Sequence, residues 1–173
     1  QLPILDADSI YHQLLEPEDG NPSPLAQRIA EAFDGVLQTD GSVDRKKLGE
    51  MVFGHPERLA QLSQLTHPAV GMSFAMQIQS LREAGAACAI YDVPLLYENR
   101  LESGLDGVVV VWVPQELQVV RLRARDGLSE EQALARLTSQ APLDTKRDKA
   151  TWVIDNSGTL EETQRQVTEL LTE

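Results

Sequence analysis

Four short runs of the sequence are apolar almost without interruption, and stretches with helical patterning separate them. The runs are PILD (3–6), AACAIYDV (86–93), GVVVVWV (107–113) and TWVIDN (151–156). A strand that is covered on both faces has no need of polar residues at alternate positions, and parallel strands need long crossovers such as helices. The sequence therefore predicts an α/β fold with a parallel sheet whose strands are buried on both faces.

Prolines mark several helix starts between these runs, because proline fits the first position of a helix, where no backbone N–H is needed. They predict helices that begin at Ser23-Pro24, at His55-Pro56 and at His67-Pro68. The last of these is expected to run to about Ala84. Further along, Ser129 stands before two glutamates and predicts the N-cap of another helix.

The connection between the first and second runs is long. It spans about 80 residues of helical pattern, far more than one crossover helix requires, so we expect an inserted helical subdomain. The arginine-bearing segment between the third and fourth runs is predicted to form a hinged lid. The expected organisation is an α/β core from 1–8, 86–113 and 151–173, a helical subdomain from 9–85 and a lid from 114–150.

Charge is distributed unevenly along the chain. The net charge of −12 argues against a protein that binds nucleic acid through its phosphates. Residues 121–149 nevertheless carry seven basic side chains against five acidic ones, which leaves eight basic and 22 acidic residues elsewhere. A basic segment on an acidic protein indicates attraction to a small anion. The alternative is an ordinary mixed-charge helical face.

Composition excludes several other classes of protein. The single cysteine, Cys88, excludes an internal disulfide and a cysteine-based zinc site, and its apolar surroundings predict a buried thiol. No apolar run approaches the roughly 18 residues of a membrane span, and no secretory leader is recognisable. We therefore expect a cytoplasmic protein without membrane contact, either a monomer or a small homo-oligomer.

Polar residues follow three of the four predicted strands. The first strand ends in Asp6-Ala7-Asp8, the second in Asp92, and the fourth in Asp155 followed by Asn156-Ser157-Gly158. Ligands bind at the carboxyl ends of strands in open parallel sheets, so we expect one rim that faces the arginines of the lid. Phosphoryl transfer uses such a set, because arginines bind phosphoryl oxygens and a carboxylate orients the attacking hydroxyl. Each carboxylate taken alone would more often be a helix cap or a turn residue.

Several longer segments resemble one enzyme family in sequence and in order. They are PILDADSIYHQLLEP, GSVDRKKLGEMVFGHPE, LTHPAV, YDVPLLYEN and RLRARDGLSEEQALARLTSQAPLDTKRDKATWVIDNSGTLEE. The sequence is similar to the dephospho-CoA kinase family. The resemblance implies a P-loop NTPase fold of the nucleoside-monophosphate-kinase type, with 9–85 as a CoA-binding insertion. It also implies transfer of a phosphoryl group from ATP, with Mg²⁺, to the ribose 3′-hydroxyl of dephospho-CoA, the final step of coenzyme A synthesis.

The same resemblance implies roles for the strand-end carboxylates. Asp8 matches the catalytic carboxylate that accepts the proton of the 3′-hydroxyl. Its alternative role is the N-cap of the helix that follows, and both roles can hold together. Asp92 matches an acid that holds Mg²⁺ through water, and its alternative role is a turn residue before Pro94.

The lid and the remaining site residues are implied in the same way. Arg136 matches the family's phosphate-facing arginine, and a guanidinium suits phosphate oxygens better than an ammonium does. The alternative for Arg125 is a salt bridge with neighbouring acids, and that for His67 is a residue at a helix start. The expected ATP-binding residues are Arg136, Arg125, Lys146, Asn156, Ser157 and Gly158. The expected residues of the acceptor-substrate site are Asp6, Tyr11, His67, Leu95, Tyr97 and Glu98.

One motif that the resemblance implies does not occur in the 173 residues. The phosphate-binding loop, G-x-x-x-x-G-K-[ST], has no match, and all four lysines lie in other contexts. Gln1 coincides with the start of the family's second strand. In this fold type the strand before the loop lies in the middle of the sheet, and its removal would leave two inner edges unpaired. We therefore expect the parent protein to contain this segment.

Two other functions stay open on sequence alone. One is a different nucleotide or small-metabolite kinase of the same fold. The other is a non-catalytic protein that binds CoA or a nucleotide, for which the unmatched loop is the best support. Asp8 argues against this second alternative, because a protein that only binds its ligand does not need a carboxylate to accept a proton from a reacting hydroxyl.

The unmatched loop generates a first prediction. A polypeptide of these 173 residues alone should show little or no kinase activity, because it lacks the lysine and the backbone amides that bind the β- and γ-phosphates. The measurement is the formation of product from ATP and dephospho-CoA. A rate close to that of a family member with the loop would contradict the prediction.

Overall fold

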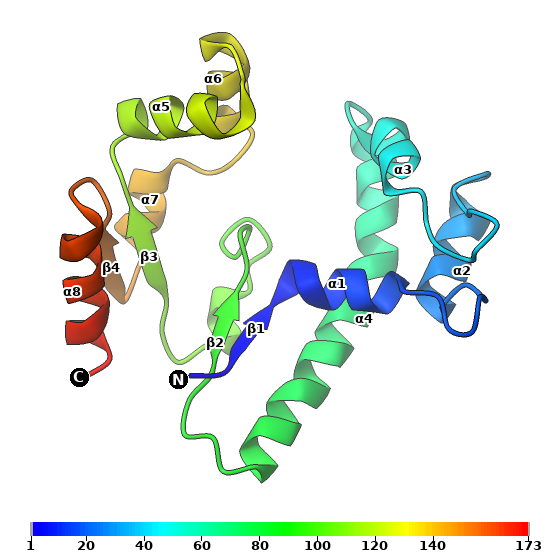
Figure 1. The fold of residues 1–173 in the computed structure, drawn as a ribbon, viewed down its shortest axis with the longest axis horizontal. Coiled ribbons are helices and arrows are strands. Elements are labelled where there is room, and N and C mark those ends of the chain that lie inside the picture. Colours follow the sequence, from blue (N-terminus) through cyan, green and yellow to red (C-terminus); the bar gives the residue numbers. More distant parts are fainter. Residues whose placement is uncertain (1, 173) are drawn as a thin grey trace. The chain divides into compact units, whose positions relative to one another are not determined.

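The structure of the protein is a computed structural model that describes residues 2–172, and these form two compact units, 2–93 and 94–172 (Figure 1). The first unit contains β1 (Ile4–Asp6), α1 (Ala7–Leu15), α2 (Pro24–Ala32), α3 (Arg45–Val52), α4 (Pro56–Glu83) and β2 (Ile90–Asp92). The second unit contains η1 (Glu102–Gly104), β3 (Val109–Trp112), α5 (Gln115–Asp126), α6 (Glu130–Thr138), α7 (Leu143–Arg147), β4 (Trp152–Asp155) and α8 (Leu160–Leu170). None of the helices described is long and apolar enough to cross a membrane.

In the first unit a short parallel strand pair is joined directly to a group of helices. β1 and β2 pair in register, which places Asp6 opposite Asp92. α1 begins at the residue after β1, and all four α-helices of the unit lie in sequence between the two strands. Their apolar faces enclose a core in which Ile29 and Phe33 are almost fully buried. This core, rather than the strand pair, holds the unit's largest buried side chains.

Ser23 connects the first two helices of this core. Its hydroxyl donates a hydrogen bond to the carbonyl of Leu14 at 2.6 Å and accepts one from the amide of Ala26 at 3.2 Å. The same side chain therefore caps α2 and binds the end of α1. Because Ser23 is buried, water cannot replace these bonds without a rearrangement.

α4 corrects one prediction. The sequence predicted separate helices at His55-Pro56 and His67-Pro68, but a single helix of 28 residues runs through Pro68. Proline removes one backbone hydrogen bond from a helix interior and normally kinks or ends the helix. Here Leu65 and Ala69, on either side of the proline, both pack against the helical core, and this shared packing offsets the lost bond. The prediction of a helix start at Pro68 was therefore wrong.

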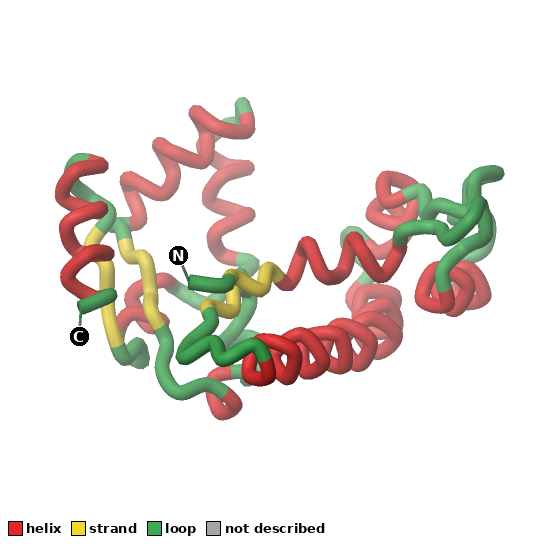
Figure 2. The backbone as a smooth tube through the Cα atoms, turned by 60° about the horizontal axis from the view of Figure 1, so that its bottom comes forward, coloured by secondary structure: helices red, strands yellow, loops and turns green. Residues whose placement is uncertain are grey.

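In the second unit β3 and β4 also form a parallel pair, with Trp112 opposite Asp155. Figure 2 shows the four strands of the chain as two short pairs, drawn in yellow. α8 follows β4, and its Gln166 side chain binds both backbone groups of Asp155. Gln166 Oε1 accepts from the amide and Nε2 donates to the carbonyl, each at 2.8 Å. The side-chain amide thus fixes the position of α8 along β4.

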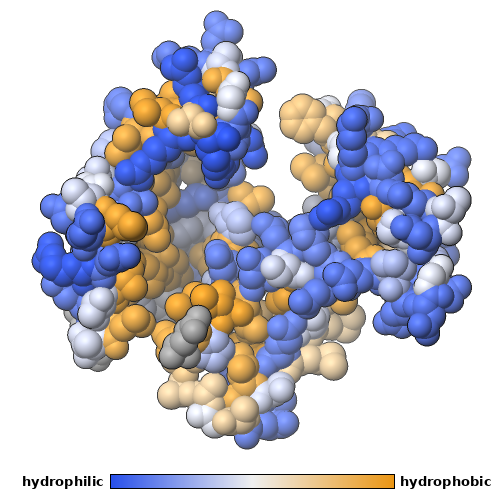
Figure 3. Space-filling model, viewed as in Figure 1, coloured by the Kyte–Doolittle hydropathy of each residue, from blue (hydrophilic) through white to orange (hydrophobic). Residues whose placement is uncertain are grey.

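The strands lie within the predicted apolar runs and pair as β1 with β2 and β3 with β4, but their burial differs from the prediction. Within these pairs Leu5, Val110 and Ile154 are buried, whereas Val109 and Val111 are 43% and 50% exposed. Each unit therefore covers one strand face and not both, and Figure 3 shows apolar side chains at the surface over β3.

Cys88 also departs from its prediction. The apolar run around it predicted a buried thiol, but β2 begins only at Ile90 and Cys88 lies exposed in the segment before the strand. Outside the strand, the apolar neighbours of Cys88 in sequence do not cover it.

The position of Ser23 generates a prediction about stability. Replacement of Ser23 with alanine should lower the free energy of unfolding by about 1–3 kcal/mol, because it removes a helix cap and leaves a buried carbonyl unpaired. Chemical denaturation followed by circular dichroism measures this change. Ser63→Ala is the matched control, since its hydroxyl bonds only to the Leu59 carbonyl within α4 and the residue is part-exposed. Equal effects of the two substitutions would contradict the assigned role of Ser23.

Candidate active site

Asp6 ends β1 and is also the N-cap of α1. Its carboxylate accepts a hydrogen bond from the amide of Ser9 at 2.7 Å, and its backbone has the extended conformation of a cap residue. The strand therefore turns into the helix without an intervening loop. The sequence left the N-cap as an alternative role of Asp8, and the structure gives this role to Asp6 instead.

Asp8 lies in the first turn of α1 and is exposed. Among residues 2–172 its carboxylate makes no hydrogen bond and no ion pair, because Asp6 already satisfies the nearby amide. The helix dipole favours a negative charge in this turn. The Asp8 carboxylate is thus an exposed hydrogen-bond acceptor without a partner among the described residues.

Asp92 ends β2 opposite Asp6, so the first unit brings together the carboxyl ends of both its strands. Asp92 is exposed, and its side chain has no hydrogen-bond partner within the described part of the chain. In that part no three acidic, histidine or cysteine side chains gather into a set that could hold a metal ion. Mg²⁺ commonly takes only one or two carboxylates and completes its shell with water and phosphate oxygens, and Asp92 fits that mode of binding.

The helical part of the first unit holds two further predicted residues, Tyr11 and His67. Tyr11 is half-buried on α1; burial raises the pKa of its hydroxyl, and the nearby Arg45 opposes that rise. Arg45 also donates a hydrogen bond to Nε2 of His12 at 2.8 Å. His67 is exposed within α4. It is therefore not the helix-start residue of the alternative interpretation.

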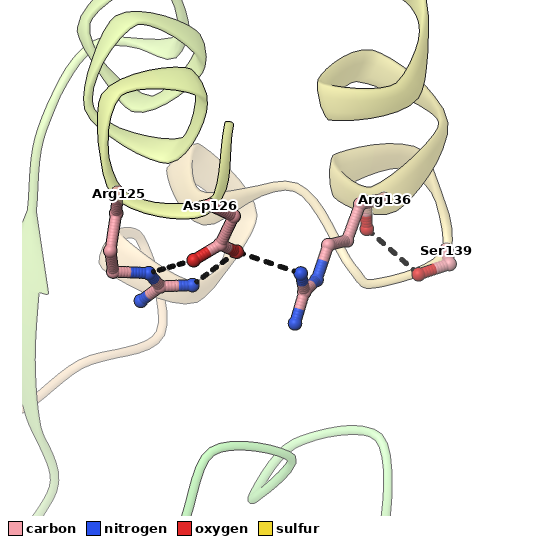
Figure 4. A network of polar contacts seen from close by, with 4 residues as sticks. All are labelled: Arg125, Asp126, Arg136 and Ser139. Atoms are coloured by element: carbon pink, nitrogen blue, oxygen red, sulfur yellow. Dashed lines mark hydrogen bonds and ion pairs between the residues drawn. The ribbon is translucent and has the colours of Figure 1, made fainter. Parts of the chain in front are cut away.

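Arg125 and Arg136 share one carboxylate, that of Asp126 (Figure 4). Arg125 donates from Nε to Oδ1 at 2.7 Å and from Nη2 to Oδ2 at 3.0 Å. Arg136 donates from Nη1 to Oδ2 at 2.8 Å. The hydrogen bonds from Arg125, followed by the charges of Arg125 and Arg136, lower the pKa of Asp126 despite an opposing desolvation. The three side chains form one network at the ends of α5 and α6.

Glu98 and Lys146 form an ion pair of 2.7 Å, and their side chains are only 23% and 11% exposed. Glu98 Oε1 also accepts a hydrogen bond from the amide of Ala141 at 3.0 Å. Burial raises the pKa of Glu98, but the bonds from Lys146 and Ala141 outweigh it and lower the pKa overall. Two residues expected to bind different ligands thus bind each other.

Tyr97 lies beside this ion pair in sequence. The ammonium of Lys149 is 5.9 Å from the centre of its ring. Its hydroxyl oxygen is buried and has no hydrogen-bond partner among the described residues. Burial, followed by the negative charge of Glu102, raises the pKa of Tyr97. Leu95, in the same loop, is 39% exposed.

The loop after β4 is held in place by its own side chains. Asp155 Oδ1 accepts from the amide of Ser157 at 2.8 Å. The side chain of Ser157, followed by this amide, lowers the pKa of Asp155. The side chain of Asn156 accepts from the hydroxyl of Thr163 at 3.1 Å. A side chain at Gly158 would collide with the carboxylate of Glu162. Hydrogen bonds thus hold the loop at Asn156 and Ser157.

Comparison with known proteins decides the family. The sequence model of the family described as "Dephospho-CoA kinase" matches residues 1–162. The chain belongs to the dephospho-CoA kinase family.

Relatives and solved structures agree with this assignment. The dephospho-CoA kinase of Bacillus licheniformis is 43% identical over 169 residues, which are 97% of this chain and 82% of that protein. The one from Shouchella clausii is 41% identical over 170 residues, or 98% of this chain and 85% of that protein.

The solved dephospho-CoA kinase from Campylobacter jejuni is 30% identical with a TM-score of 0.72, and TT1252 from Thermus thermophilus is 33% identical with a TM-score of 0.80. Each of these matches covers 99% of this chain and 84% of the other. The chain thus has the α/β fold of this P-loop kinase family.

In this dephospho-CoA kinase family member, the structure brings together some of the predicted residues. Asp6, Asp8 and Asp92 lie at the strand ends of the first unit, and Arg125 and Arg136 lie in one network of the second. The alternative for Arg125, a salt bridge with a neighbouring acid, is confirmed. The sequence interpretation did not name Asp126 as that acid, nor did it predict a bond from Arg136 to Asp126. Its position directly after Arg125 and before Gly127, where α5 ends, was the available signal.

The Glu98–Lys146 pair generates a prediction about pH. Because the pKa of Glu98 is lower in the folded protein than in the unfolded chain, the pair stabilises the fold above the ordinary glutamate pKa of about 4.3. This contribution is lost as the pH falls through the lowered value. Glu98→Gln should therefore destabilise the second unit by about 1–3 kcal/mol at neutral pH, and the difference from the wild type should vanish in strong acid.

Denaturation followed by tryptophan fluorescence measures this effect, because both tryptophans, Trp112 and Trp152, lie in the second unit. Glu169→Gln is the matched control. It breaks an exposed pair with Arg165 at 3.3 Å, and such pairs contribute at most about 1 kcal/mol. If the two substitutions have the same effect at neutral pH, the stabilising role of Glu98 is wrong.

Proposed function

We propose that this protein transfers the γ-phosphoryl group of ATP to the ribose 3′-hydroxyl of dephospho-CoA and so completes coenzyme A synthesis. The observation that carries the proposal is the unpaired carboxylate of Asp8, beside a strand end where Asp6 alone supplies the helix cap. Membership of the dephospho-CoA kinase family supports the choice of substrates.

In the proposed reaction the 3′-oxygen forms a bond to the γ-phosphorus of ATP. The bond from that phosphorus to the oxygen that bridges it to the β-phosphorus breaks, and ADP leaves. Asp8 orients the hydroxyl and accepts its proton as the new bond forms. The position of Asp8 in the first turn of α1 keeps the carboxylate exposed to a substrate.

The second unit supplies the proposed contacts to ATP. Arg136 and Arg125 keep free N–H groups beyond their bonds to Asp126, so they can bind phosphate oxygens without giving up those bonds. Lys146 keeps N–H groups beyond its bond to Glu98, but its side chain is largely buried. We assign the loop from Asn156 to Gly158 to contact with the adenine, and 114–150 to a lid.

Asp92 is the proposed residue for Mg²⁺, through water. When bound with ATP, the ion would offset the charge that develops on the β- and γ-phosphate oxygens. An exposed carboxylate at a strand end, without a partner in the described residues, is available to orient the water shell of that ion.

The helical region 9–85 is proposed to bind dephospho-CoA. Tyr11 and His67 contribute from this region, and Asp6 supports the site from the end of β1. Leu95, Tyr97 and Glu98 are the further residues proposed for binding the acceptor substrate. Support for Tyr97 comes from its buried hydroxyl, which has no partner in the described part of the chain and is free to bind a ligand or water.

The role of Asp8 generates a prediction about catalysis. In the complete protein that the gene encodes, Asp8→Asn should lower kcat by about 10²–10⁴-fold and change KM for dephospho-CoA little, because asparagine cannot accept the hydroxyl proton. Coenzyme A formation from ATP and dephospho-CoA is the measurement. Glu57→Gln is the matched control, since Glu57 is an exposed acid in the first turn of α4.

Two outcomes of this experiment separate the alternatives. A wild-type protein that phosphorylates a nucleoside monophosphate but not dephospho-CoA would replace the proposed substrate. A wild-type protein that forms coenzyme A, with an Asp8→Asn variant of equal kcat, would keep the function and remove Asp8 from its assigned role.

A further inference from the structure

Asp126 is an unexpected residue between two arginines that are proposed to bind phosphate. Its carboxylate cancels one of their two positive charges, which by itself weakens attraction to an anion. The carboxylate nevertheless has good geometry, with both oxygens occupied and all three hydrogen bonds between 2.7 and 3.0 Å. A residue that lowers the charge of an anion site needs another physical reason to be there.

The positions of the side chains suggest that reason. Asp126 is the last residue of α5, which Gly127 ends in a left-handed conformation with φ of 68°. Arg136 lies in the last turn of α6. The Asp126 side chain is 22% exposed, whereas those of Arg125 and Arg136 are 69% and 57% exposed. The carboxylate is thus the sheltered member of the network, and both guanidinium groups extend into solvent.

Each arginine keeps most of its donors free. An arginine has five N–H groups. Arg125 uses two of them on Asp126 and Arg136 uses one, which leaves three and four for a ligand. A free arginine side chain loses rotamer entropy when a ligand fixes it. A guanidinium that is already held in place loses less, so binding to it is stronger.

We infer that Asp126 is a positioning residue that holds Arg136 and Arg125 in place to bind the phosphate oxygens of ATP. This inference rests on the proposed function. The carboxylate touches neither substrate nor the reacting atoms in this scheme, and it acts only through the two guanidinium groups. The gain in phosphate binding from holding the two arginines in place then exceeds the electrostatic attraction that the negative charge of Asp126 removes.

The competing explanation is a simple ion pair that joins α5 to α6. Exposed pairs of this kind contribute little to stability. The fold offers a second pair for comparison, because Arg123 on α5 and Glu130 on α6 lie 3.5 Å apart with 47% and 67% exposed side chains. That pair joins the same two helices without involving Arg125 or Arg136. Glu130→Gln is therefore the matched control.

The experiment compares Asp126→Asn with Glu130→Gln in the complete protein that the gene encodes. Asparagine has the shape of aspartate but lacks the charge and one acceptor oxygen, so it cannot hold both arginines. We expect Asp126→Asn to lower kcat/KM for ATP about 10-fold or more and to leave KM for dephospho-CoA nearly unchanged. Glu130→Gln should leave both values within about twofold of wild type, and both variants should melt within a few degrees of each other.

A double-mutant cycle with Arg136→Ala tests whether Asp126 acts through that arginine. If it does, Asp126→Asn should cost much less in the Arg136→Ala background than in the wild type, because part of what it positions is already gone. Glu130→Gln should have the same small effect in both backgrounds. Asp126→Glu retains the charge and should recover part of the loss.

Three results would overturn the inference. The first is an Asp126→Asn variant whose kinetic constants match those of Glu130→Gln. The second is an unchanged cost of Asp126→Asn in the Arg136→Ala background. The third is a lower KM for ATP in Asp126→Asn, which would make the carboxylate a repulsive element. Wild-type formation of coenzyme A, measured in the same assay, shows separately whether the proposed function holds.

Discussion

The hydrogen bond from the Ser9 amide to the Asp6 carboxylate determines much of what the first unit presents to a ligand. It starts α1 at the very end of β1, so the first helical turn stays next to the strand end. α1 packs against α2 and α4, and its Tyr11, Leu14 and Leu15 join the core around Phe33. The position of Asp8 follows from this start of α1, although Asp8 takes no part in the bond between Ser9 and Asp6.

The second unit uses charge differently. Its paired residues are held by contacts across long stretches of sequence, such as Glu98 with Lys146, and by the shared carboxylate of Asp126. In these contacts the charges of the basic segment 121–149 are partly neutralised by acids of the same unit. Although basic residues are in excess in this segment, acids of the same unit pair with several of them. The guanidinium groups of Arg125 and Arg136 nevertheless keep N–H donors that these pairs do not use.

The sequence predicted those features that depend on local patterns. The positions of the strands follow from continuous apolar runs, and the cap at Ser129 follows from a serine before two glutamates. The continuation of α4 through Pro68 could not be predicted, because it depends on tertiary packing of Leu65 and Ala69 that overrides a local signal. The exposed face of β3 could not be predicted either, since an apolar run does not show whether other elements cover both faces of a strand.

The same distinction applies to the site. Asp8 and Asp92 could be selected because strand ends can be located from sequence. Whether Asp6 or Asp8 is the N-cap of α1 depends on the backbone geometry of two residues, which the sequence pattern does not show. The partnership of Arg136 with Asp126 spans ten residues and two helices, and that of Lys146 with Glu98 spans far more. Side-chain pairing at such separations depends on the fold as a whole.

Gln166 limits which substitutions the end of the chain can accept. Its amide offers one acceptor and one donor to the two backbone groups of Asp155. Glutamate has nearly the same shape but no N–H when ionised, so one of its carboxylate oxygens would lie against the carbonyl oxygen of Asp155 and be repelled by it. Lysine would supply a donor without an acceptor. Substitution at this position is therefore limited by the need for a donor and an acceptor in one side chain, and the residue so held directly precedes the loop assigned to the adenine.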